Sequence, residues 1–270
     1  MKIQPEKIFN HWTLLVINIL IVIAAEASGT FFARSGLIHL LAIIFVGLGL
    51  VRLWFHTHVH DQYLEPIIHR GILALLVLAI SHIVEYFSFM HLKLPRQAIY
   101  ANVINFYLAG LLIINLGVEG FLRKLRNDSS KIIPTSWIVI AGFFVLIGIL
   151  FMNPQSVSLS PGSWHVFGYL LATTLVATFS IYRLTLLKNH VAIMVKFISY
   201  FIAGIILISA CAVISATEEY IAKLGVPTIQ IAFINHFLFY GALSLVFLAY
   251  ERLLHLGGVY DDLEKLYGAQ

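Results

Sequence analysis

The chain has 270 residues, of which 60% are hydrophobic and 11% are charged, and its mean hydropathy is +0.92. A soluble domain carries about 25% charged residues, so this composition excludes an ordinary soluble enzyme. The formal charge of +4 does not indicate a nucleic-acid partner, because the basic residues flank apolar segments. The single cysteine, Cys211, excludes an intramolecular disulfide framework and a four-cysteine metal site.

The apolar residues fall into blocks of about 20, which is the length of a helix that crosses about 30 Å of hydrocarbon. Pro66 and Pro134 open two of these blocks, where a missing N–H costs little, and no proline lies in the middle of a block. The sequence predicts an all-α bundle of eight transmembrane helices, forming a single domain over residues 1–270. The expected spans are Thr13–Ala33, Gly36–Phe55, Pro66–Met90, Ala98–Leu122, Pro134–Met152, Ser163–Leu187, Ala192–Thr217 and Ile229–Tyr250.

The distribution of Lys and Arg predicts how this bundle is oriented. If the N-terminus is inside, 13 basic residues lie at the inner face and only four lie outside, namely Arg34, Lys93, Arg96 and Lys223. Cytoplasmic loops carry the excess of Lys and Arg, so we expect an integral-membrane protein with both termini in the cytoplasm. An odd number of spans would destroy this segregation. Lipid is then the first expected partner, and other membrane subunits and a quinone are further candidates.

Four ionisable residues lie inside the apolar blocks: Glu26, His82, Glu85 and His236. With a rise of about 1.5 Å per residue, Glu26, His82 and His236 are each expected roughly 10–12 Å below the outer boundary. Glu85 follows His82 by one helical turn on the same face. Ionisable groups in hydrocarbon are costly unless they face protein, water or a ligand, so several at one level predict a functional site.

These residue types can bind a metal or a haem. Two histidines and a carboxylate suit iron, and histidine-rich sets suit copper or zinc, so we expect a transition-metal site with His39 as an accessory ligand. Alternatively, His82 and His236 are the axial ligands of a b-type haem, and the carboxylates transfer protons from a quinol. Either arrangement predicts an electron-transfer protein or a subunit of a membrane oxidoreductase, whose catalytic residues and substrate the sequence does not identify.

Two other functions and a structural interpretation stay open. One alternative is a proton-coupled small transporter in which the buried Glu and His residues relay protons. Another is a membrane sensor or assembly subunit without chemistry of its own, whose cytoplasmic segment Arg252–Gln270 contacts a partner. The structural interpretation is polar packing, in which each buried His or Glu hydrogen-bonds to a neighbouring helix.

A second histidine-rich segment lies at the inner face. His56, His58 and His60 alternate with other residues directly after the second block. In an extended segment such alternation points the three imidazoles to one side, and histidine-rich runs of this kind bind divalent metal. We therefore expect a weaker second metal site here.

The spacing Glu65-x3-His69-x12-His82 resembles the metal-binding pattern in the C subunit of particulate methane and ammonia monooxygenases. The resemblance covers about 20 of the residues and implies that His69 and His82 share a metal. The predicted span Pro66–Met90 opposes this, because a helix separates the two histidines by about 20 Å along its axis. We therefore do not assign the chain to that family.

Overall fold

A computed structural model describes residues 16, 20, 65–90, 96–125, 159–190 and 194–254 of the chain. Within these residues the fold is all-helical and contains no strand. The predicted spans Thr13–Ala33, Gly36–Phe55 and Pro134–Met152 lie outside the described residues, apart from positions 16 and 20.

Five long helices make up the described part: α5 (Glu65–Met90), α6 (Arg96–Leu125), α8 (Trp164–His190), α9 (Val195–Lys223) and α10 (Thr228–Leu254). All five are long and apolar enough to cross a membrane. The predicted helical class and membrane character are therefore confirmed at this level. The helices extend beyond the predicted spans, and α9 in particular continues past Thr217 to Lys223. The last turns of α9 are polar and lie at the end of the bundle. Hydropathy therefore ends the predicted span before the helix itself ends.

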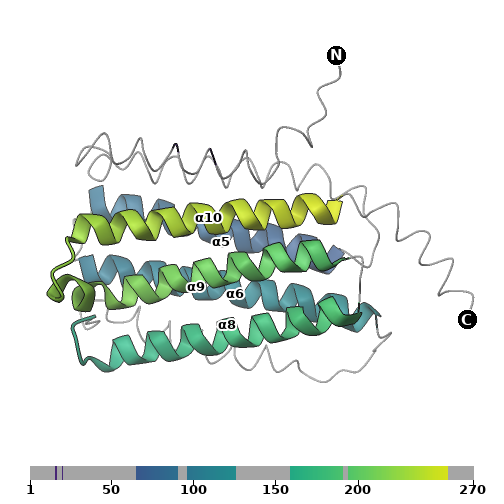
Figure 1. The fold of residues 1–270 in the computed structure, drawn as a ribbon, viewed down its shortest axis with the longest axis horizontal. Helices are drawn as coiled ribbons and strands as arrows, with labels where there is room; N and C mark the ends of the chain where they lie inside the picture. Colours follow the sequence, from purple (N-terminus) through teal and green to yellow (C-terminus); the bar gives the residue numbers. More distant parts are fainter. Residues whose placement is uncertain are drawn as a thin grey trace, which may run out of the picture.

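The five helices lie side by side, with α10, α9 and α8 in front and α5 and α6 behind them in the view of Figure 1. Helix α6 packs against α5, α8 and α9, and α9 packs against α10. Glycines allow two of these close approaches: Gly117 of α6 lies against Arg70 and Pro66 of α5, and Gly204 of α9 lies against Val246 of α10. Such contacts between small residues and a neighbouring helix are typical of membrane bundles, where packing replaces the hydrophobic driving force.

Helices α6 and α8 run parallel. Gln97 near the start of α6 hydrogen-bonds to the backbone N–H of Leu159 just before α8, and Glu119 near the end of α6 pairs with Arg183 near the end of α8. The chain therefore leaves α6 at one end of the bundle and enters α8 at the other. Residues 126–158 connect these two ends, which is the connection that the predicted span Pro134–Met152 would make.

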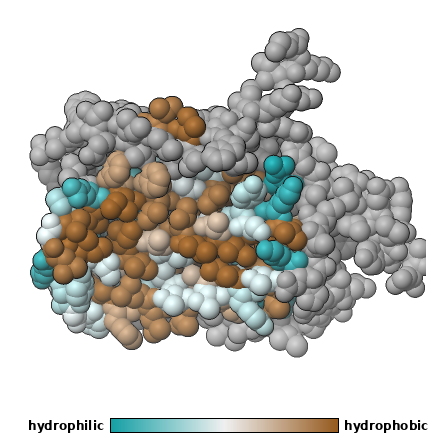
Figure 2. Space-filling model, viewed as in Figure 1, coloured by the Kyte–Doolittle hydropathy of each residue, from teal (hydrophilic) through white to brown (hydrophobic). Residues whose placement is uncertain are grey.

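The outward face of α8 carries many large apolar side chains and no charged residue from Trp164 to Leu187. Trp164 and Phe167 are 63% and 68% exposed, and Leu171, Leu175 and Tyr182 continue the same stripe. Thr173 and Ser180 lie on the buried face of α8, whereas Thr174, Thr178 and Thr185 are exposed between the apolar side chains. Apolar surface runs along the middle of the described helices, and hydrophilic residues gather toward the ends (Figure 2). This distribution matches a bundle whose outer surface meets lipid.

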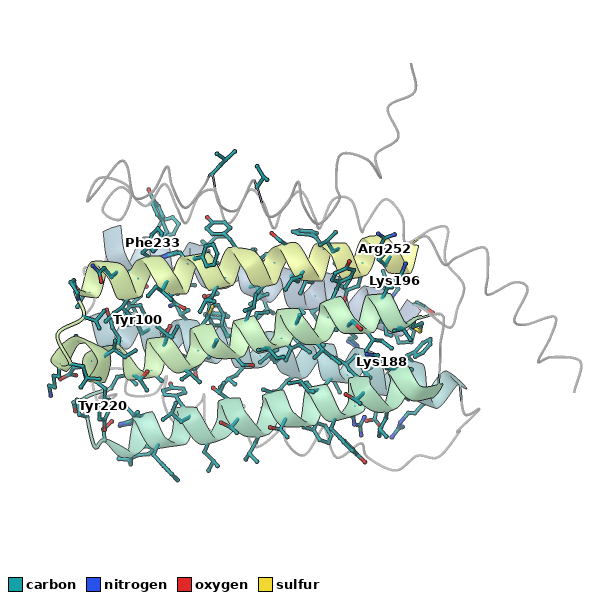
Figure 3. The ribbon with its side chains drawn as sticks, viewed as in Figure 1. Tyr100, Lys188, Lys196, Tyr220, Phe233 and Arg252 are labelled. Carbon is teal, nitrogen blue, oxygen red and sulfur yellow. The ribbon has the colours of Figure 1, made fainter. Side chains whose placement is uncertain are left out.

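The two ends of the described bundle differ in charge. Lys188, Lys196 and Arg252, from α8, α9 and α10, lie together at one end, which we name the basic end (Figure 3). The opposite end carries Glu218 and Glu219, near the last turns of α9, and is named the acidic end. Lys and Arg concentrate at one end, which is the segregation that the sequence predicts, although the side of the membrane that each end faces stays a prediction.

Candidate functional site

His82 and Glu85 form a buried pair on α5, in the half of the helix toward the acidic end. The His82 side chain is 1% exposed, that of Glu85 is 12% exposed, and the imidazole Nδ1 lies 3.2 Å from a Glu85 carboxylate oxygen. The pairing follows from helix geometry, because residues three apart share one face. The apolar run of α5 places both in the bundle, where the imidazole and the carboxylate face one another at ion-pair distance.

His236 reaches the same region from α10. Its Nδ1 lies 2.7 Å from the Ala232 carbonyl oxygen, one turn earlier on the same helix. His236 interacts electrostatically with both Glu85 and His82. The structure thus brings together three of the residues that the sequence singles out.

Aromatic rings surround this group, which we name the His–Glu cluster (His82, Glu85 and His236). The His82 ring packs against Phe239 with centroids 4.2 Å apart, and Phe239 in turn stacks on Tyr107 of α6. Tyr107 also interacts electrostatically with Glu85. The rings keep the cluster in an apolar setting, where charge on any member is expensive and proton positions are tightly coupled.

The hydrogen bond of His236 defines its tautomer. A carbonyl oxygen accepts only, so Nδ1 of His236 carries the proton and, in the neutral ring, Nε2 carries the lone pair. The Glu85 carboxylate sets the same arrangement for His82 when it accepts from Nδ1. An imidazole with its Nδ1–H held by an oxygen is the usual form of a metal-binding histidine.

The metal site itself is not complete in the described helices. Among the residues described, no three His, Cys, Asp or Glu side chains lie close enough together to hold a metal ion. Two further predicted ligands, Glu26 and His39, lie outside the described residues, as does the inner run of His56, His58 and His60. Helix α5 is continuous from Glu65 to Met90, so His69 and His82 cannot share a metal in the way the monooxygenase-like spacing implies.

The acidic end contains a polar group that the sequence analysis did not assemble. Gln97 Nε2 donates to a Glu219 carboxylate oxygen at 3.0 Å, and the Tyr100 hydroxyl donates to Glu218 at 3.5 Å. Lys223 lies 3.3 Å from the other oxygen of Glu219. Glu218 and Glu219 are adjacent in the sequence, but their partners on α6 lie more than a hundred residues away in the chain.

Two polar contacts join α6 to α8, and both went unrecognised in the sequence. Asn115 Nδ2 donates to Ser180 Oγ at 2.5 Å, and both residues are only 1% exposed. One turn nearer the basic end, Glu119 pairs with Arg183 and, at 3.2 Å, with Arg123. The sequence does carry one indication of these contacts, because Asn115 and Glu119 are polar residues four apart in an apolar block and so share a helix face. Only the fold shows which residues of α8 they contact.

No protein-family model, curated protein or solved structure matches this chain. The site is therefore interpreted from its own residues and their geometry.

Proposed function

We propose that this chain is an integral-membrane protein that moves protons across the bilayer, as a proton-coupled small transporter does, and that the His–Glu cluster binds the transported proton. The observation that carries the proposal is the buried contact between His82 Nδ1 and the Glu85 carboxylate, 3.2 Å apart. Ionisable residues inside a membrane are rare, and they characteristically mark proton and ion pathways.

The chemistry of the cluster suits proton binding. In its ionic form, the His82–Glu85 pair carries compensating charges, and moving one proton from the imidazole to the carboxylate makes both groups neutral. Gaining or losing a further proton leaves a net charge in an apolar setting, which a structural change or a neighbouring group must then compensate. His236 lies within electrostatic range of both members, so a charge on any one of the three acts on the other two. These are the properties of a proton-loading site.

A metal- or haem-based redox function is the second candidate. The specific observation in its favour is that both histidines hold Nδ1 against an oxygen, which leaves Nε2 as the ligand atom. Iron, copper or zinc bound there would supply electron-transfer or Lewis-acid chemistry, and a b-type haem would supply electron transfer. The two histidines need a third ligand for a metal, for which Glu26 and His39 are the candidates, whereas a haem would need only the two.

Proton flux into liposomes tests the first proposal. Purified protein is reconstituted into vesicles that contain a pH-sensitive dye, and a potassium gradient with valinomycin drives protons inward. We expect the wild-type protein to acidify the vesicles faster than protein-free vesicles. Glu85→Gln and His236→Ala should each reduce the protein-dependent rate at least tenfold.

Ser244→Ala provides the control for this experiment. Ser244 is buried on α10, and its hydroxyl donates only to the Tyr240 carbonyl of its own helix in the described structure. Its loss should leave the rate unchanged. A wild-type rate equal to that of empty vesicles, or full flux in both cluster variants, would refute proton transport through this cluster.

A further inference from the structure

Buried polar side chains extend along the whole contact between α6 and α8. On α8 they occupy one face, because they recur at intervals of three, four or seven residues, and they are all buried or half-buried. On α6 the face toward them carries Asn105, Asn115 and Glu119. We name the set the α6–α8 polar track, and its members on α8 are His165, Tyr169, Thr173, Ser180 and Arg183.

Three cross-contacts show that the two faces meet. Asn105 interacts with the Tyr169 side chain, Asn115 donates to Ser180, and Glu119 pairs with Arg183. The order of these contacts follows the parallel course of the helices, so the track runs in one direction along the bundle. Its far end, at Tyr100 and Glu218, belongs to the acidic end.

The track is long enough to cross a membrane. From Tyr100 to Glu119, α6 advances about 28 Å at about 1.5 Å per residue, which is close to the about 30 Å thickness of bilayer hydrocarbon. A carboxylate stands at each extreme, Glu218 at the acidic end and Glu119 at the basic end. Hydroxyl, amide and phenol groups lie between them.

Several buried atoms in the track are not satisfied by the protein. Within the described residues, Asn105 Oδ1, Asn115 Oδ1 and the Tyr169 hydroxyl make no hydrogen bond of normal geometry, although each atom is shielded from the surface. A buried polar atom without a partner is unfavourable, because it has lost its hydrogen bond to water and gained none in return. Asn105 and Tyr169 face one another, so one bound water can satisfy both of their atoms, and a second can satisfy Asn115 Oδ1, because a buried water makes hydrogen bonds to two to four polar partners.

We propose that the α6–α8 polar track is a hydrated pathway that carries protons between the two ends of the bundle, with Glu218 and Glu119 at its mouths. Water bridges the Asn105–Tyr169 and Asn115–Ser180 levels, and protons pass along the hydrogen-bonded chain without any bond to carbon being made or broken. Tyr107, on α6 between Asn105 and Asn115, lies within electrostatic range of Glu85 in the His–Glu cluster. The inference rests on the proposed proton transport and specifies its route.

Hydration is tested first, by a measurement that does not depend on transport. In a Cys211→Ala background, Thr173→Cys places a thiol in the middle of the track, and Ala212→Cys places one in the apolar core of α9. Thr173 and Ala212 are 2% and 0% exposed. A small hydrophilic thiol reagent should label the cysteine at 173 at least tenfold faster than the cysteine at 212. Equal, slow labelling would overturn the hydrated pathway, whatever the protein transports.

Proton flux in the same liposomes tests the route. Asn115→Leu replaces the central amide by an apolar group of similar size and should reduce flux at least tenfold, while Asn115→Asp retains a polar group and should preserve most of it. Ser180→Ala should reduce flux severalfold. Its matched control is Ser244→Ala, because Ser244 is also buried and, like Ser180, donates to the carbonyl four residues earlier on its own helix, but it lies on α10 away from the track.

The outcomes separate this inference from the proposed function. If His236→Ala abolishes flux while Asn115→Leu and Ser180→Ala leave it intact, protons cross by another route and the inference is overturned while the proposed function stands. If the wild-type protein moves no protons, the proposed function and the proton-carrying role of the track both fail. Fast labelling at position 173, together with flux that depends on Asn115, supports the pathway.

Discussion

The Tyr250 ring on α10 lies directly against the backbone of Gly71 on α5, and its hydroxyl donates a hydrogen bond to the Ile67 carbonyl at 3.3 Å. Tyr250 is 2% exposed and also meets the rings of Phe197 and Phe201 edge-on. The absence of a side chain at Gly71 is what lets this ring enter. The contact joins the basic-end halves of α5, α9 and α10.

Gly71→Ala should therefore destabilise the bundle. A Cβ at this position would overlap the Tyr250 ring, and overpacking of a filled core costs about 1–3 kcal/mol. Gly168→Ala is the matched control, because Gly168 is also helical but a Cβ there meets nothing within 4 Å. That change should leave stability unchanged or raise it by up to about 1 kcal/mol. Thermal unfolding in detergent measures both, and equal melting temperatures would contradict the contact.

Arg183→Met should also destabilise the protein, because it removes one of two cations from Glu119. Breaking a fully buried ion pair costs about 3–5 kcal/mol. Here the side chains of Arg183 and Glu119 are 18% and 14% exposed and Arg123 remains beside the carboxylate, so we expect a smaller loss of about 1–2 kcal/mol.

Lys196→Met supplies the comparison for Arg183→Met. Lys196 is an exposed cation at the same basic end, and its removal should change stability by less than about 0.5 kcal/mol. Unfolding followed by circular dichroism in the same detergent compares the two. Equal effects would mean that the Glu119–Arg183 pair contributes nothing beyond ordinary surface charge.

The redox candidate predicts a bound cofactor that the proton-transport proposal does not require. An optical spectrum and elemental analysis of the purified protein should give a Soret band for haem, or a stoichiometric metal without one. If a cofactor is present, His82→Ala and His236→Ala should each remove it while the protein still inserts. Full cofactor content in both variants would exclude these histidines as ligands.

Glu85→Gln then distinguishes the two cofactors. A carboxylate that binds a metal directly is lost in this variant, so metal content should fall strongly. A bis-histidine haem should be retained almost fully, because the new side chain has the same shape and still offers an amide oxygen to His82 Nδ1, which lies 3.2 Å from the carboxylate. Ser81→Ala, at the buried residue before His82, is the control and should leave cofactor content unchanged.

The charge segregation predicts which end of the bundle faces the cytoplasm. In a Cys211→Ala background, Lys196→Cys reports on the basic end and Leu224→Cys, at an 84% exposed position, reports on the acidic end. A membrane-impermeant thiol reagent applied to intact cells should label only position 224, because the basic end faces the cytoplasm. Labelling of both positions from outside would refute this topology, and labelling of position 196 alone would reverse it.

Much of the architecture follows from the sequence because hydrophobic length is a local property. Each of the five described helices contains an apolar block of the length that spans hydrocarbon, and prolines at 66, 95 and 227 mark where helices begin or end. The segregation of Lys and Arg between ends is also local, since it depends only on which residues flank each block. The helical ends were less predictable, as α9 shows, because its last polar turns continue to Lys223.

The chain alone determined that His82, Glu85 and His236 are unusual, since ionisable side chains in apolar blocks are costly wherever they lie. Only the tertiary structure decided what they contact, because the partners of a helix face are set by packing between segments far apart in the sequence. Thus Phe239 meets His82, Asn115 meets Ser180, and Glu119 meets Arg183 across helix contacts that no periodicity specifies. Composition therefore indicates a bundle of membrane-spanning helices. The polar contacts inside that bundle depend on which faces the helices turn toward one another.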